Sequence, residues 1–170
     1  MSRKQLLILG GMLAAMAVGI FVVFYVGWGR PDPAPANAGE RLAFAARWLL
    51  VPGLALLAGI GLTANQRFLK ADAIDGERHV DSNVFEINLR YNHNTLEQVI
   101  LAAVAWTGLA LVLPVEQLGV IARMAVLFGV GRAAFWLGYL YAPWARAFGM
   151  GLTAYPSFAA LVYLAWLALR

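Results

Sequence analysis

The chain has no cysteine among its 170 residues and only two histidines, His79 and His93. This excludes disulfides, thiolate metal ligands and a protein thiol as nucleophile. Two histidines do not make an ordinary zinc site without carboxylates, so we predict no metal site. Charged residues are also scarce, at 13% of the chain, whereas 62% of the residues are hydrophobic. A water-soluble domain of this size needs a more polar surface, so the composition indicates a membrane protein.

Five apolar runs are long enough to cross about 30 Å of hydrocarbon, which takes roughly 20 helical residues. They cover residues 6–28, 44–62, 99–113, 118–141 and 148–169, and the third reaches full length only with the polar residues before it. No strand-like alternation or internal repeat competes with an all-α fold. Short turns near Pro114 and Pro143 predict that the last three helices pack as antiparallel neighbours.

The first run has two interpretations. Arg3 and Lys4 precede it and a Pro/Ala-rich segment, 30–39, follows it, which is compatible with a secretory signal cleaved near 36–38. A signal core has only about 7–15 apolar residues, so the longer run favours a retained helix. We therefore divide the chain into an N-terminal helix, or signal-like segment, with an extended linker at 1–40, and a four-helix membrane domain at 41–170.

We interpret the cations that produce the formal net charge of +4 as signals of membrane topology rather than as a sign of a nucleic-acid partner. The cations lie mostly at expected helix ends and in loops, where they contact anionic headgroups and set orientation. Cations gather at the N-terminus and in the polar segment 63–88, whereas the turn at 114–117 has none. Because cytoplasmic loops are rich in Lys and Arg, we predict that the N-terminus, this segment and the 141–146 turn are cytoplasmic.

A stripe of polar residues comes directly before the third apolar run. Arg90, Asn94 and Glu97 have the i, i+4, i+7 spacing that places them on one helix face. A carboxylate facing lipid is costly, so we expect Glu97 to face protein or a water-filled cavity. We expect His93 to point away from the Glu97 side and to be an interfacial residue rather than a base.

A second stripe lies on the next helix, which returns to the same side. Arg132 and Tyr139 are seven residues apart, and Arg146 follows the helix. Converging stripes of cations, an amide, an anion and a hydroxyl suit a small zwitterionic ligand, because guanidinium groups bind carboxylates bidentately and Glu97 can accept an ammonium group. The structural alternative is that Arg90 and Glu97 pair, at i and i+7 or through a neighbouring helix, and lock the bundle.

These residues resemble the MAPEG family, the membrane-associated proteins of eicosanoid and glutathione metabolism. The second core helix of that family has an Arg-x3-Asn-x2-Glu signature, and later helices tend to carry an Arg, a Gly-Tyr and a further Arg about seven residues on. The resemblance covers roughly residues 44–169. The matching residues here are Arg90, Asn94, Glu97, Arg132, Gly138, Tyr139 and Arg146.

The resemblance implies a MAPEG-type four-helix membrane bundle, here with an additional N-terminal helix, that forms a homotrimer. Glutathione would bind between subunits near the cytoplasmic face as the co-substrate of a transferase or peroxidase, and a lipophilic small molecule would arrive from the membrane lipids. By position, the residues implied in glutathione binding are Arg90, Asn92, Asn94, Glu97, Arg132, Tyr139 and Arg146. Those implied in catalysis are Arg67, Tyr139 and Arg146.

Two departures from the family keep other functions open. Phe135 and Gln98 stand where some members have tyrosines, so two hydroxyl groups are absent. A second hypothesis is therefore a non-catalytic lipid-binding or scaffold protein on the same fold. A third, a small transporter, has little support, because Arg123 and Arg132 are the only charges near the middle of a span beyond the polar stripe.

Overall fold

The computed structural model describes residues 1–69 and 83–170, apart from the side chain of Asn83. These residues form five long helices and a short 3-10 turn, with no strand among them, which confirms the all-α prediction. His79 and half of the predicted polar segment, residues 70–82 of 63–88, lie outside the described residues. The elements are α1 (Arg3–Tyr25), α2 (Ala38–Phe68), α3 (Asn83–Val112), η2 (Val115–Gln117), α4 (Gly119–Tyr141) and α5 (Ala147–Ala168).

Each of the five helices is long and apolar enough to cross a membrane, judged by length and composition. The five predicted runs are therefore confirmed as helices, although their ends differ. The largest difference is in α3, which starts at Asn83 because the polar residues before the apolar run are helical as well. Glu97 consequently lies about 21 Å along the helix axis from Asn83, at about 1.5 Å per residue.

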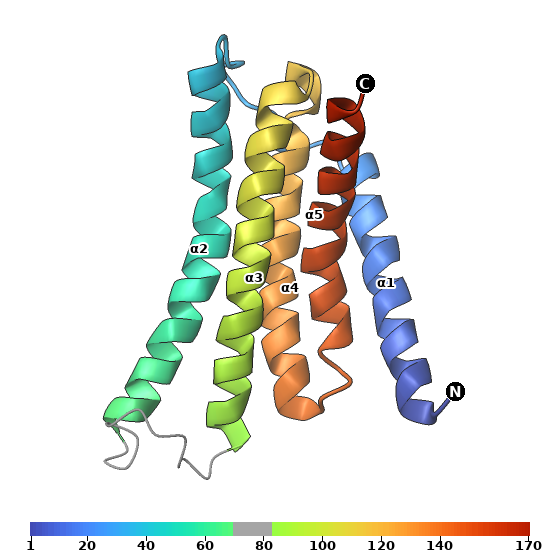
Figure 1. Cartoon of the computed structure of the whole chain (residues 1–170), viewed down its shortest axis with the longest axis vertical. Helices are drawn as coiled ribbons and strands as arrows, with labels where there is room; N and C mark the ends of the chain where they lie inside the picture. Colours follow the sequence, from blue (N-terminus) through green and yellow to red (C-terminus); the bar gives the residue numbers. More distant parts are fainter. Residues whose placement is uncertain (70–82) are drawn as a thin grey trace.

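Consecutive helices run in opposite directions (Figure 1). The N-terminus, the end of α2, the start of α3 and the 142–146 turn lie at the end drawn at the bottom, which we call the lower end. The C-terminus, η2 and the 26–37 segment lie at the upper end. The predicted packing of the last three helices is confirmed, because α3, α4 and α5 all contact one another.

Side-chain caps set where the first two helices begin. In α1 the Ser2 hydroxyl accepts a hydrogen bond from the Gln5 amide nitrogen, and the Gln5 side chain accepts one from the Ser2 amide nitrogen, which is a capping box. In α2 the Asn37 Oδ1 accepts from the Glu40 amide nitrogen at 3.0 Å. This cap starts α2 at Ala38, so the helix begins inside the segment predicted to be an extended linker.

The main apolar core lies where α3 and α4 meet α2. Trp106 of α3 and Phe128 of α4 are almost completely buried and pack edge to face, with ring centroids 6.2 Å apart. Alanines surround them and allow close approach of the helices. The fully buried ones are Ala45, Ala102, Ala105, Ala110, Ala122 and Ala125.

α1 packs against α5 and α4. The contact is close because small residues line it: a Cβ added to Gly11 would lie 3.3 Å from the Phe148 amide nitrogen. A Cβ added to Gly151 of α5 would lie 2.7 Å from the Ala15 Cβ. Small residues four apart let two helix backbones approach in this way. The predicted N-terminal helix is therefore packed on the four-helix unit.

The 26–37 segment crosses the upper end of the bundle from α1 to α2 (Figure 1). Arg123 of α4 donates from Nη1 to the Trp28 carbonyl oxygen at 2.9 Å, and the Trp28 ring packs edge-on against Trp48 of α2. Gly29 has a φ of 91°, a conformation that glycine adopts without strain. The 26–37 segment is thus attached to the first turns of α4 by this hydrogen bond.

Candidate functional site

Arg132 lies at the centre of a buried polar network that joins three helices. Its side chain is only 1% exposed. Nη1 donates to Asn94 Oδ1 of α3 at 2.7 Å, and Nη2 donates to Thr153 Oγ1 of α5 at 2.6 Å. The guanidinium also lies over the Phe135 ring, 4.6 Å from its centroid. The predicted convergence of the two polar stripes is confirmed at this contact between Arg132 and Asn94.

The partners of Arg132 in this network are neutral, and its Nε has no hydrogen-bond partner among the described residues. Charge compensation comes through Asn94, whose Nδ2 donates to Glu97 Oε2 at 3.3 Å. A buried guanidinium without a direct carboxylate partner is costly. The network therefore links a buried positive charge on α4 to a carboxylate on α3 through one amide.

A second group lies nearer the lower end, and we call it the paired-arginine cluster: Arg90, Tyr139 and Arg146. Arg90 Nη1 donates to Tyr139 Oη at 3.0 Å, and Glu86 Oε2 lies 3.8 Å from Arg90 Nη2. The guanidinium carbon of Arg146 lies 4.4 Å from the centroid of the Tyr139 ring. Tyr139 is buried, whereas the Arg90 side chain is 62% exposed. One phenol thus lies between two guanidinium groups, one of them open to the surroundings.

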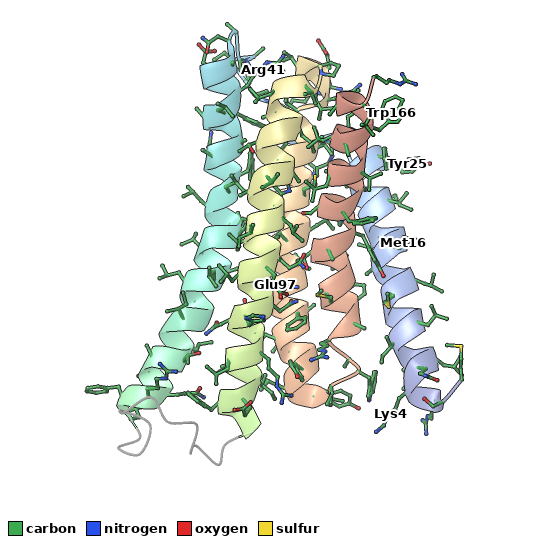
Figure 2. The ribbon with its side chains drawn as sticks, viewed as in Figure 1. Lys4, Met16, Tyr25, Arg41, Glu97 and Trp166 are labelled. Atoms are coloured by element: carbon green, nitrogen blue, oxygen red, sulfur yellow. The ribbon has the colours of Figure 1, made fainter. Side chains whose placement is uncertain are left out.

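Glu97 does not face the interior of the single chain. It lies near the middle of α3 (Figure 2), and its side chain is 55% exposed. Of the two expected environments, protein or a water-filled cavity, a protein interior is thus not what one chain provides. The prediction that His93 points away from Glu97 is wrong, because His93 Nε2 lies 3.3 Å from Glu97 Oε1. Residues four apart on a helix differ by only about 40° in direction, which places both side chains on one face.

Arg90 and Glu97 have other partners than each other in the structure. Arg90 contacts Glu86 and Tyr139, and Glu97 contacts Asn94 and His93. The direct form of the structural alternative, a pair between Arg90 and Glu97, is therefore absent from the contacts of the described residues. Both residues instead connect to α4, Arg90 through Tyr139 and Glu97 through Asn94 to Arg132.

Two of the predicted site residues lie apart from both groups. Asn92 points to α2, where its Nδ2 donates to the Gly59 carbonyl oxygen at 3.1 Å and to Thr63 Oγ1 at 2.8 Å. A Cβ on Gly59 would clash with Asn92 Oδ1. Arg67 is exposed at the end of α2, with its guanidinium 5.8 Å from the centroid of the Phe85 ring. Asn92 therefore joins helices, and Arg67 lies beside the first turns of α3.

Sequence reasoning missed several buried polar partners. Thr153 accepts from Arg132, and it lies in a run that otherwise suggests only a span. A second polar chain joins three helices: Trp136 Nε1 donates to Asn88 Oδ1 at 2.8 Å, and Asn88 Nδ2 donates to Gln66 Oε1 at 2.9 Å. The signal available for Asn88 was its place two residues before Arg90, within the polar start of α3.

The two departures from the family pattern are both buried. Phe135 packs between the Arg132 guanidinium and the Tyr139 ring, whose centroid is 5.9 Å from its own. Gln98 is 4% exposed, and its Oε1 has no hydrogen-bond partner among the described residues. The site therefore has one phenol hydroxyl, that of Tyr139, at the paired-arginine cluster.

Within residues 1–69 and 83–170 no group of three or more carboxylates and histidines is placed to hold a metal ion. Comparison with known protein families, with curated proteins and with solved structures finds no match. The resemblance to the MAPEG family therefore rests only on the residues quoted for it, and the function that it implies is a proposal.

Proposed function

We propose that the chain is a multi-pass membrane protein with its lower end on the cytoplasmic side. Five helices of sufficient length and hydropathy support this, as does the position of the cations. Arg3, Lys4 and Arg67 lie at the lower end, and Lys70 and Arg78 follow α2 in the sequence. Cytoplasmic segments are enriched in such residues.

We further propose that the lower end binds glutathione and presents its thiolate to a lipophilic electrophile, as a glutathione transferase or peroxidase does. The observation that carries this proposal is the paired-arginine cluster, in which Arg90 of α3 and Arg146 of the turn before α5 approach the same phenol. Guanidinium groups bind carboxylates, of which glutathione has two, and they favour a thiolate over a thiol.

The reaction we propose for the cluster is a thiolate addition. The thiol proton leaves to solvent, and the sulfur lone pair forms the bond to an electrophilic carbon. The electron pair of the π bond or leaving-group bond broken at that carbon moves onto the neighbouring atom or departing group, which takes up a proton from solvent. The Tyr139 hydroxyl and the Arg146 guanidinium are the donors positioned to stabilise the sulfur anion. Arg90 holds the Tyr139 hydroxyl in place by donating to its oxygen, which leaves the hydroxyl proton free to point to the ligand. Arg67 is the remaining candidate donor carried over from the family.

The outward position of Glu97 supports a homotrimer. In a single chain Glu97 and His93 would face lipid from the middle of a span, where ionisable groups are costly. A second copy of the chain over this face of α3 removes that exposure. It also makes Glu97 and Asn94 available to a ligand bound between subunits, where Glu97 would accept the ammonium group of glutathione.

The test is isothermal calorimetry with glutathione on the full-length protein in detergent. We expect Arg90→Ala to weaken binding at least tenfold, because it removes one guanidinium and the hydrogen bond to Tyr139. Glu97→Ala should weaken it similarly. Arg47→Ala is the matched control, since Arg47 is an exposed arginine on α2 outside the cluster. Equal affinities for Arg90→Ala and Arg47→Ala in folded oligomers would exclude the proposed site.

The second candidate is a non-catalytic lipid-binding or scaffold protein, favoured by Phe135 and Gln98. Both side chains are buried, and neither brings a hydroxyl group to the cluster. This candidate predicts that glutathione consumption with a panel of lipophilic electrophiles stays at the uncatalysed rate. Turnover that is lost in Tyr139→Phe would exclude it.

A further inference from the structure

A hollow of about 410 Å³ opens at the lower end of the molecule, between α1 and the turn that leads into α5. Leu7, Gly10 and Gly11 line it from α1, and Trp144 and Phe148 line it from the turn and the start of α5. We call it the α1–α5 groove. Its lining is apolar, and its volume lies within the range of small-molecule sites, about 300–1,000 Å³.

Two adjacent glycines create the groove. Gly10 lines the hollow, and a Cβ added to it would meet no atom within 4 Å, so the hollow has room for a side chain at this position. Gly11 is where α1 touches α5, since its added Cβ would lie 3.3 Å from the Phe148 amide nitrogen. The groove is therefore an unfilled space beside a close helix contact, closed from above where Ala15 meets Gly151.

The mouth of the groove has aromatic residues of the kind found at a membrane surface. Trp144, on the turn between α4 and α5, forms a ring pair with Tyr141 at the end of α4, with centroids 6.0 Å apart. Trp and Tyr are enriched at the depth of lipid headgroups. Gly11 lies about 10 Å further along α1 than Lys4, so the groove runs from headgroup depth into the hydrocarbon.

The mouth also has positive charge. Lys4 is three residues before Leu7 and seven before Gly11, which places it on the same face of α1 as the groove. Figure 2 shows Lys4 at the lower end of α1. Arg3 precedes it, and the first turn of α1 contains no acidic residue. An anionic headgroup at this position would be attracted by both cations.

We propose that the α1–α5 groove binds one acyl chain of an anionic phospholipid, whose headgroup contacts Lys4 and Arg3. This proposal rests on the membrane embedding proposed above and not on glutathione binding, because Arg146 turns to Tyr139 and α3 whereas the groove faces α1. A helix from a second chain does not fit: at about 10 Å in diameter it needs roughly twice this volume over the same length.

The test is native mass spectrometry of the full-length protein after incubation with phosphatidylglycerol and phosphatidylcholine of identical acyl chains. The wild type should retain one phosphatidylglycerol per chain in preference to phosphatidylcholine. Gly10→Leu fills the groove without a steric clash at Cβ, and it should lower retention of both lipids at least tenfold. Gly61→Leu is the matched control, since Gly61 on α2 also has open space around its added Cβ.

A second variant tests the headgroup contact. Arg3→Gln with Lys4→Gln should lower phosphatidylglycerol retention roughly fivefold for each cation removed and leave phosphatidylcholine retention unchanged. The proposal is overturned if Gly10→Leu and Gly61→Leu retain equal lipid, or if the wild type does not distinguish the headgroups. A change of oligomeric mass in Gly10→Leu with unchanged lipid would instead make the groove a contact between chains. Glutathione calorimetry on Gly10→Leu, expected to match the wild type, separates failure of this proposal from failure of the proposed function.

Discussion

At the scale of single residues, Arg132 shows how a charge is held inside a bundle of apolar helices. Its hydrogen-bond partners are an amide and a hydroxyl, its guanidinium lies over an aromatic ring, and a carboxylate is reached only through Asn94. Each neutral partner therefore contributes more to the stability of the fold than it would if Arg132 also had a direct ion pair. Loss of one partner leaves a buried donor of a charged group without an acceptor.

We predict that Thr153→Val lowers the free energy of unfolding by about 1–3 kcal/mol, because Arg132 Nη2 loses its acceptor. The measurement is reversible denaturant unfolding in detergent micelles. Thr107→Val is the control: the Thr107 hydroxyl bonds only to carbonyl oxygens of its own helix, so we expect a change within about 0.5 kcal/mol. Equal losses in the two variants would contradict the role assigned to Thr153.

Half of this network could be predicted from the sequence. Helical spacing predicted the faces of Asn94 and Arg132, because polar and charged residues in an apolar helix are costly unless they face protein or water. Thr153 could not be predicted, since a threonine within an apolar helix is equally satisfied by its own backbone, and here it also lies 3.0 Å from the Met150 carbonyl oxygen. The sequence also did not indicate that Phe135 covers the Arg132 guanidinium.

At the scale of helices, glycine allows the close contact between α4 and α5. A Cβ on Gly149 would overlap the Phe135 amide nitrogen and the Gly131 carbonyl oxygen, both of them backbone atoms. Backbone atoms of a packed helix do not move aside as a flexible side chain does. Hydropathy predicts that these two helices exist, but it does not predict the distance between them. That distance depends on which small residues of the two helices face each other.

We predict that Gly149→Ala destabilises the protein by about 1–3 kcal/mol, because the forced separation of α4 and α5 outweighs the gain of up to about 1 kcal/mol in helix propensity. The thermal unfolding midpoint should fall accordingly. Gly61→Ala has space for its Cβ and should leave the midpoint unchanged or raise it. A raised midpoint in Gly149→Ala would show that the two helices are not in such close contact.

At the scale of the whole molecule, the first and last helices lie side by side (Figure 1). The sequence predicted both as spans and left open whether the first is retained or cleaved. It could not predict their contact, because a row of small residues such as Gly11, Ala15 and Gly19 can pack against any helix with a matching surface. In the structure, the matching surface on α5 consists of Ala147, next to Gly11, and Gly151, next to Ala15.

The absence of cysteine makes this contact directly testable by disulfide cross-linking. An added Cβ on Gly11 lies 3.6 Å from the Ala147 Cβ, within the usual disulfide range of about 3.5–4.5 Å. We therefore expect Gly11→Cys with Ala147→Cys to form an intramolecular disulfide under mild oxidation, seen as a faster-migrating species on non-reducing electrophoresis. Gly10→Cys with Ala147→Cys should form it less readily, since the Ala147 Cβ lies more than 4 Å from the added Gly10 Cβ, beyond the mean disulfide separation of about 3.8 Å. Equal cross-linking of both pairs would contradict a fixed orientation of α1.

The position of α1 beside α5 has a consequence for biosynthesis. A ribosome adds about 5–20 residues per second, so α5 follows the completion of α1 by roughly 6 to 25 s. During that interval the small-residue face of α1 has no α5 to pack on, while α2, α3 and α4 can already pair with one another. Before α5 is made, α1 can contact only α4 among its two partner helices. The helix made first therefore completes its packing only when the chain is nearly finished, although the 26–37 segment already connects it to the bundle.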